Sequence, residues 1–127
     1  MALCAVAVLL GACGGDGGGR SPGQLAMVAG QKFDPPTVRV SVGDTVTWTN
    51  ESPETHTVTA YDEDLPEGAT YFSSGGFDSE EDARSNLSDA LIDPDETFEV
   101  TFDEPGTYDY FCIPHEGSGM KGTIIVE

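Results

Sequence analysis

Apolar residues recur at every second position in segment after segment from residue 24 to the end of the chain. Val46 and Trp48 alternate with threonines, and Phe98, Val100 and Phe102 alternate with polar residues. This period of two is typical of strands that bury one face. Together with two short apolar runs, the pattern predicts about eight strands, at residues 25–29, 38–42, 46–49, 56–60, 69–73, 97–102, 107–112 and 120–127.

This number of strands predicts an all-β fold, an antiparallel β-sandwich with Greek-key connections. Gly43 and Asp44 stand between two of the predicted strands and form a hairpin turn signal. The connection at residues 61–96 departs from the pattern. There Ser79 and three acidic residues resemble a capped helix start, and apolar residues follow at helical spacing (Ala83, Leu87, Ala90 and Leu91). We therefore expect one short helix in this connection.

The charge of the chain is strongly unbalanced, with 23 Asp or Glu against 5 Lys or Arg and a formal net charge of -18. Nucleic acid is excluded as a partner, because its phosphates require a basic surface. Residues 61–104 hold 15 of the 23 acids and a single cation, Arg84. This segment is interpreted as a solvated acidic face, with a docking surface for a cationic partner as the alternative. The charge also favours a monomer, and a high-salt habitat is one explanation for it.

The N-terminus has the pattern of an export signal. Residues 2–12 form an uncharged apolar run, which is shorter than a membrane-spanning helix requires and is typical of a signal peptide. Residues 1–12 are thus predicted to be a signal peptide. The run ends in Leu-Gly-Ala-Cys13, which resembles the lipobox of prokaryotic lipoproteins; cleavage without lipidation is the alternative. Residues 13–23 would then be a lipidated cysteine and a Gly-rich flexible tether, and residues 24–127 one folded domain.

One short segment near the C-terminus carries metal-binding chemistry. Cys112, His115 and Met120 offer a thiolate, an imidazole and a thioether at the spacing C-x2-H-x4-M. Cys112 has no cysteine partner within the folded domain, and His56 is the only other histidine of the chain. Two histidines, one cysteine and a weak axial methionine are the ligand set of blue copper sites. Zinc is a weaker candidate because a thioether is a poor zinc ligand. Each residue alone would more often be a packing residue.

The segment from Gly106 to Val126 resembles the copper loop of plastocyanins, and the lipobox, tether and acidic domain together resemble halocyanins, the small blue copper proteins of haloarchaea. This resemblance implies a cupredoxin domain at residues 24–127 that binds one copper ion. The implied ligands are the four residues named above (His56, Cys112, His115 and Met120). In the family an asparagine usually follows the first histidine and steadies the cysteine loop, but Thr57 stands here. The resemblance also implies that His115 lies beneath an apolar patch that includes Pro114.

The expected function is one-electron transfer by a carrier tethered to the outer face of a membrane. Four protein ligands leave no open metal position, so we do not expect an enzyme. The expected partners are membrane-bound redox donor and acceptor proteins, and the expected location is the extracytoplasmic side of the cell membrane. A copper storage or delivery module is the main alternative, although this chain lacks the Met- or His-rich stretch typical of such a site. A surface sandwich without a metal is the third possibility.

Overall fold

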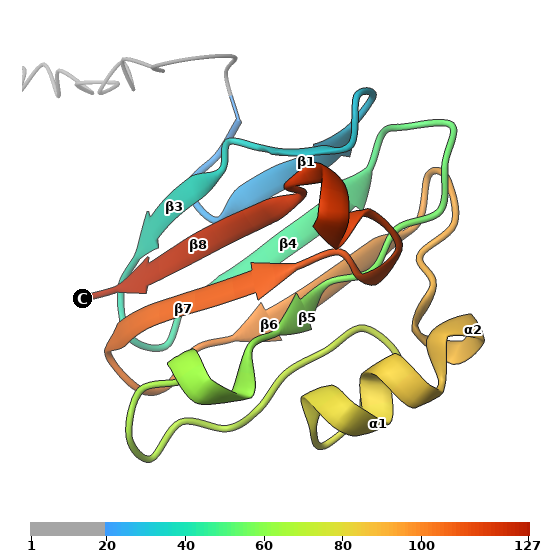
Figure 1. The fold of residues 1–127 in the computed structure, drawn as a ribbon. Helices are drawn as coiled ribbons and strands as arrows, with labels where there is room; N and C mark the ends of the chain where they lie inside the picture. The colour runs from blue at the N-terminus through green and yellow to red at the C-terminus, as the bar shows by residue number, and fades with distance from the viewer. Residues whose placement is uncertain (1–19) are drawn as a thin grey trace, which may run out of the picture.

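The computed structural model describes residues 20–127. The predicted signal peptide (residues 1–12), Cys13 and most of the predicted tether therefore lie outside the described residues. Two four-stranded sheets pack face to face as a β-sandwich (Figure 1), as the sequence predicted. The strands are β1 (Gln24–Val28), β2 (Lys32–Asp34), β3 (Thr37–Val40), β4 (Thr45–Asn50), β5 (Thr59–Ala60), β6 (Thr97–Thr101), β7 (Gly106–Phe111) and β8 (Lys121–Val126). The helical segments are η1 (Asp62–Asp64), α1 (Glu80–Ser85), α2 (Leu87–Ala90) and η2 (Ile113–Ser118).

The sheets have the strand orders β2-β1-β4-β6 and β3-β8-β7-β5. The β1–β4 and β3–β8 pairs are parallel, so the expectation of antiparallel pairing throughout is wrong for these two pairs. The parallel pairing follows from the course of the chain at Gly43 and Asp44. The turn there joins β3 of one sheet to β4 of the other and closes no hairpin. Each strand then pairs with a partner distant in sequence, and Gly43, at φ 90°, donates to the Phe102 carbonyl oxygen.

The number of strands agrees with the prediction, but one predicted strand does not form and one observed strand was not predicted. Residues 69–73 form no strand, and only Ser73 bridges to Thr59. In their place β2 forms, which the alternation could not indicate because Phe33 is its only buried residue. The predicted strand at residues 56–60 is reduced to β5, and His56 bridges instead to Ile92 across the connection.

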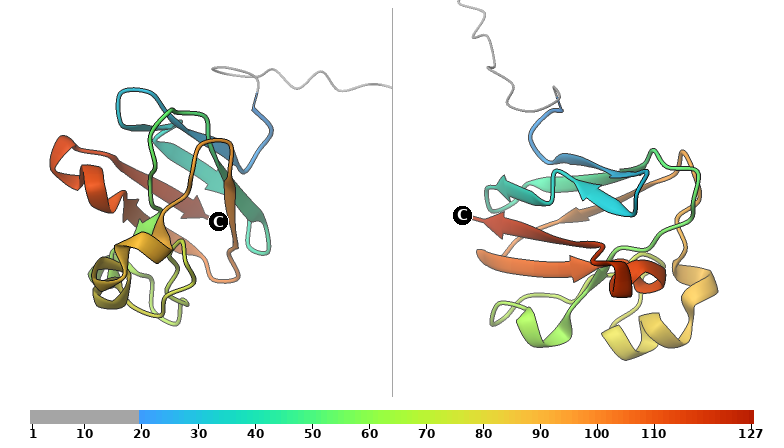
Figure 2. Two further views of the ribbon diagram at one scale, coloured as in Figure 1. Left: turned by 90° about the vertical axis from the view of Figure 1, so that its right-hand side faces the viewer. Right: turned by 45° about the horizontal axis from the view of Figure 1, so that its top comes forward.

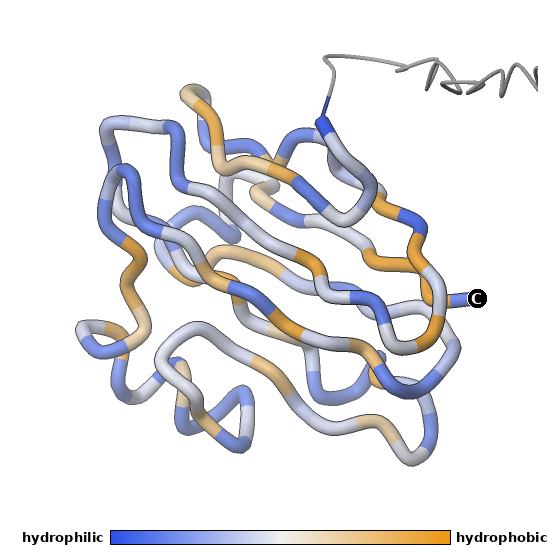
Figure 3. Tube along the Cα trace, turned by 180° about the vertical axis from the view of Figure 1, so that it is seen from behind, coloured by the Kyte–Doolittle hydropathy of each residue, from blue (hydrophilic) through white to orange (hydrophobic). Residues whose placement is uncertain are grey.

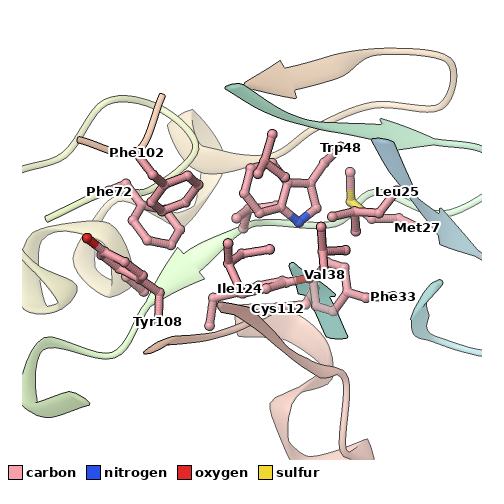
Figure 4. Packing of buried hydrophobic residues seen from close by; sticks show 14 of the residues in the cluster. Leu25, Met27, Phe33, Val38, Trp48, Phe72, Phe102, Tyr108, Cys112 and Ile124 are labelled. Atoms are coloured by element: carbon pink, nitrogen blue, oxygen red, sulfur yellow. The ribbon is translucent and has the colours of Figure 1, made fainter. Parts of the chain in front are cut away.

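The core lies between the sheets and is centred on Trp48 (Figure 4), whose ring meets the Tyr110 ring edge-on at 5.4 Å between centroids. Phe72, Phe102 and Tyr108 pack together at one end of the core. Buried residues occupy every second position of β4 and β8, in agreement with the period of two. Hydrophilic and hydrophobic segments are interspersed along the chain trace (Figure 3). Gly122 lies opposite Tyr110 on the neighbouring strand, and a Cβ there would collide with the Tyr110 ring.

The long connection between β5 and β6 carries α1 and α2 and lies beyond β5, the edge strand of the β3-β8-β7-β5 sheet (Figure 2). Ser79 caps α1 as predicted, because its hydroxyl accepts a hydrogen bond from the Asp82 N–H at 3.1 Å. The single predicted helix is divided in two at Asn86, whose φ of -124° is not helical. No helix within residues 20–127 is long and apolar enough to cross a membrane.

Candidate metal centre

Three of the four predicted ligands lie in the loop that joins β7 to β8 at one end of the sandwich (Figure 1). Cys112 follows the last residue of β7, and η2 carries His115. Two backbone hydrogen bonds close the loop. The Cys112 N–H donates to the Met120 carbonyl oxygen at 3.0 Å, and the Met120 N–H donates to the His115 carbonyl oxygen at 3.2 Å. The loop backbone therefore brings these three residues together before any side chain is considered.

His56 approaches from the connection between β4 and β5. Its backbone forms an isolated bridge with Ile92, in which the His56 N–H donates at 3.1 Å and the His56 carbonyl oxygen accepts at 2.7 Å. These two hydrogen bonds between His56 and Ile92 fix this part of the chain against the segment that leads into β6. The His56 side chain is fully buried and faces the loop of His115 and Cys112.

The donor atoms of three predicted ligands form a compact triangle. The Nδ1 atoms of His56 and His115 are 3.2 Å apart, and Cys112 Sγ lies 3.7 Å from the first and 3.5 Å from the second. The centre of a triangle with these edges is about 2 Å from each corner, which is the length of a metal–nitrogen bond. The geometry of the described residues thus fits a single small metal ion.

Met120 completes the set at the base of the loop. It is fully buried, and its backbone hydrogen bonds hold it between Cys112 and His115. Two imidazole nitrogens, a thiolate and a thioether match the soft and intermediate donors that copper accepts in both of its oxidation states. The donor chemistry therefore fits copper better than zinc, which prefers more thiolate.

Burial sets the protonation of the metal-free site. Removal from water lowers the pKa of His56, and the neighbouring His115 lowers it further, so the neutral, metal-binding form of His56 is favoured. Burial raises the pKa of the Cys112 thiol, against the smaller opposite effect of hydrogen bonds from Thr57 and His115. Metal binding must therefore release the thiol proton, and metal affinity must rise with pH.

Thr57 performs the loop-steadying task that the family usually assigns to an asparagine. Its N–H donates to Cys112 Sγ at 3.3 Å, and its hydroxyl accepts a hydrogen bond from the Ile113 N–H at 2.9 Å. The two contacts hold the Cys112 side chain and the residue that follows it. A threonine can do this because its hydroxyl, like an amide oxygen, accepts a backbone hydrogen bond.

The outer nitrogens of both histidines have partners that the sequence did not indicate. Ser52 Oγ lies 2.7 Å from His56 Nε2, and a Glu54 carboxylate oxygen lies 3.2 Å from His115 Nε2. Neither residue belongs to a recognisable motif, so no pattern could have identified them. The surface at His115 therefore includes the Glu54 carboxylate as well as the exposed Pro114, the residue before His115. Val42, the one large hydrophobic residue exposed among residues 20–127, bonds to Glu127 at the end of β8 that is far from this loop.

A further contact missed from the sequence joins α1 to the metal loop. The Arg84 guanidinium makes two parallel bonds to the Glu116 carboxylate, at 3.0 and 3.1 Å, and lies 4.3 Å from the centre of the Phe111 ring. Tyr61 also donates to Glu116, at 2.7 Å. Hydrogen bonding from Arg84 lowers the pKa of Glu116, and Glu116 raises the pKa of Arg84. The residue next to His115 is thus held by charged and neutral donors from the acidic connection.

Comparison with known proteins agrees with this site. Residues 25–127 match the family of copper binding proteins described as the plastocyanin/azurin family. The plastocyanin of Scenedesmus fuscus is 39% identical over 95 residues, which are 75% of this chain and 86% of that protein. Amicyanin-alpha of Methylorubrum extorquens is 34% identical over 100 residues, 79% of this chain and 68% of that protein.

Solved structures give the same result for the fold. A mutant plastocyanin of fern, solved in oxidized and reduced forms, superposes with a TM-score of 0.61 at 25% identity, over 82% of this chain and 99% of that one. The match of the family to nearly the whole described domain, the relatives above 30% identity and the cluster of His56, Cys112 and His115 all agree. The chain belongs to the plastocyanin/azurin family of copper-binding proteins, the cupredoxins.

Proposed function

We propose that this chain is a one-electron carrier that holds one copper ion between His56, Cys112, His115 and Met120. The observation that carries the proposal is the compact triangle of two imidazole nitrogens and one cysteine sulfur. Copper in such a ligand set exchanges one electron between Cu(I) and Cu(II). The protein supplies a fixed set of donors that suits both oxidation states.

The arrangement favours electron exchange over catalysis. His56, Cys112 and Met120 are fully buried. With His115 as the fourth ligand, no position on the metal is left for a substrate. A metal that activates water or a carbonyl group keeps an open position for it. The two sheets and the hydrogen bonds from Thr57 and Ile92 hold the donors in place, which limits the rearrangement that accompanies a change of charge.

His115 is the proposed route for the electron. Its side chain is 15% exposed, whereas the His56, Cys112 and Met120 residues are fully buried. The imidazole therefore joins the metal position to the surface through bonded atoms. A redox partner that docks on the face around His115 and Pro114 would approach the metal by its shortest path.

The proposed attachment to a membrane rests on the N-terminal sequence. An apolar run followed by Leu-Gly-Ala-Cys13 and a Gly-rich segment suits a lipidated Cys13 and a flexible tether on the extracytoplasmic side of the cell membrane. Residues 13–23, fully extended, span at most about 40 Å. A monomeric domain on such a tether could move between a membrane-bound redox donor and a membrane-bound acceptor, as the resemblance to halocyanins implies.

Voltammetry of the copper-loaded protein tests the carrier function. We expect a reversible one-electron wave that survives repeated cycles in the presence of a copper chelator. A storage or delivery module would instead lose its copper to the chelator when the metal is reduced, and that result would overturn the proposal.

The attachment to a membrane has a separate test. The wild-type protein should be found with membranes and carry a lipid mass on Cys13, and the Cys13→Ser protein should be soluble; a wild-type protein without lipid would refute the anchor.

A further inference from the structure

One short segment supplies a partner to the outer nitrogen of both histidines. Ser52 Oγ lies 2.7 Å from His56 Nε2, and Glu54 Oε2 lies 3.2 Å from His115 Nε2. The Nδ1 atoms of the two rings face one another, at 3.2 Å. The outer nitrogen of each ring therefore contacts the segment of residues 50–54, and its other nitrogen faces the metal position.

Asn50 fixes the shape of this segment. Its side-chain amide donates to the carbonyl oxygens of Glu54, at 2.7 Å, and of Ile92, at 3.0 Å. Its side-chain oxygen accepts from the Ser52 N–H at 3.0 Å, and Ser52 Oγ lies 2.8 Å away from the same oxygen. Asn50 and Ser52 are both buried. A fully bonded buried network of this kind has one arrangement, so residues 50–54 form a rigid support for the rings.

The Glu54 carboxylate accepts a hydrogen bond from another part of the chain. The Gln31 side-chain amide, from the turn between β1 and β2, donates to the same Oε2 atom at 3.4 Å. The Glu54 side chain is 46% exposed, and no Lys or Arg of residues 20–127 forms a salt bridge with it. His115 is therefore the one basic side chain of residues 20–127 that this carboxylate contacts.

We propose that Glu54 is a positioning residue for His115, which orients the ring through its outer N–H and favours the oxidised state of the copper site. The inference rests on the proposed copper function. A carboxylate that accepts a hydrogen bond from a metal-bound imidazole fixes its tautomer and makes it a stronger donor. A stronger donor and a nearby negative charge both favour Cu(II) over Cu(I). The outer nitrogen of His56 contacts a neutral hydroxyl, so of the two rings only that of His115 contacts the carboxylate directly.

The first test is the reduction potential of two matched variants. Glu54→Gln and Glu51→Gln remove the same charge from the same segment, but Glu51 pairs with Arg20 and does not contact a histidine. We expect Glu54→Gln to raise the potential, with a shift of roughly twofold to fivefold in the equilibrium with a fixed redox mediator, the range for a partly exposed charge pair. Glu51→Gln should leave the equilibrium close to wild type. Equal shifts in both variants, or none in either, would overturn the inference.

The second test needs no redox chemistry. In protein loaded with zinc(II), which cannot change oxidation state, nuclear magnetic resonance should detect a slowly exchanging Nε2–H on His115 in wild type and in Glu51→Gln. The signal should exchange rapidly in Glu54→Ala. Unchanged exchange in Glu54→Ala would refute the hydrogen bond. If copper-loaded wild type shows no blue colour, the proposed function fails, whereas wild-type blue colour with unaltered potential in Glu54→Gln refutes this inference alone.

Discussion

The metal end of the sandwich and the acidic connection at residues 61–96 differ in almost every physical respect. At the metal end three of the predicted ligands are fully buried, and the donor atoms of His56, Cys112 and His115 lie within 4 Å of one another. The connection carries 12 acidic residues and one cation, and most of its charged side chains are exposed. This difference shows that the chemistry of a metal site restricts the choice of residues much more than exposure to water does. A metal accepts few kinds of donor in one geometry, whereas a solvated segment needs only to remain polar.

The Arg84–Glu116 ion pair is one of the contacts that join the two regions, beside the His56–Ile92 bridge and the hydrogen bond from Tyr61 to Glu116. Arg84 is the cation of the acidic connection, and Glu116 follows the predicted ligand His115. Substitutions in the metal end, at this junction and in the connection should therefore have successively smaller effects on the copper site.

Cys112→Ser should have the largest effect. The thiolate is the sulfur donor that mixes with Cu(II), so its loss should abolish the intense visible band and greatly weaken copper binding. Serine is close to cysteine in size, and the sandwich should remain folded. Absorption spectra of protein reconstituted with copper measure the effect, and circular dichroism checks the fold. An intense blue colour in the variant would remove Cys112 from the ligand set.

Met120→Leu should have a smaller effect on the same site. A long, weak axial contact contributes more to Cu(II) than to Cu(I), so its loss should raise the reduction potential while colour and copper are kept. Leucine nearly conserves the volume of methionine, and we expect a loss of less than about 1.5 kcal/mol in the free energy of unfolding. Voltammetry and denaturant titration provide the two measurements. Complete loss of copper would show that Met120 is a primary ligand.

The metal end was predictable from the sequence and the connection largely was not. Cys112, His115 and Met120 are unusual residue types at a specific spacing, and His56 is the only other histidine, so chemistry alone selected them. The exchange of sheets at Gly43 was not predictable, because an alternating pattern specifies a buried face but no pairing partner.

The supporting contacts were hidden for another reason. Glu54 and Arg84 are charged residues in polar surroundings, and such residues are usually solvated. Their contacts with His115 and Glu116 depend on how distant segments fold together, across separations of 61 and 32 residues. No local pattern records a contact of this kind.

Arg84→Ala should have an intermediate effect, because it breaks the junction between the two regions. A bidentate pair that also covers Phe111 should contribute about 1 kcal/mol to the free energy of unfolding. Arg39→Ala is the matched control. Its pair with Glu127 is exposed and distant from the metal end, and we expect less than about 0.5 kcal/mol. Double-mutant cycles for the two pairs measure both couplings; equal couplings would show that the junction is an ordinary surface ion pair.

Salt should have the smallest effect and should act on the connection. The Debye length is about 30 Å at 0.01 M and about 3 Å at 1 M, so repulsion among the acids acts mainly at low salt. We expect the melting temperature of the metal-free protein to rise with NaCl. Changing three exposed acids to amides, Glu63→Gln, Asp64→Asn and Glu67→Gln, should reduce the rise. Asp62 is a poorer choice, because it accepts a hydrogen bond from the Glu80 N–H. A melting temperature independent of salt would refute the repulsion.

The visible spectrum of the copper-loaded wild-type protein during titration with a one-electron reductant tests the central claim most directly. If His56, Cys112, His115 and Met120 hold one copper ion for electron exchange, the Cu(II) protein has a strong band in the red part of the spectrum. One equivalent of reductant per copper removes this band, and reoxidation restores it. Bound copper without such a band, or a band that does not return after reoxidation, would contradict the account.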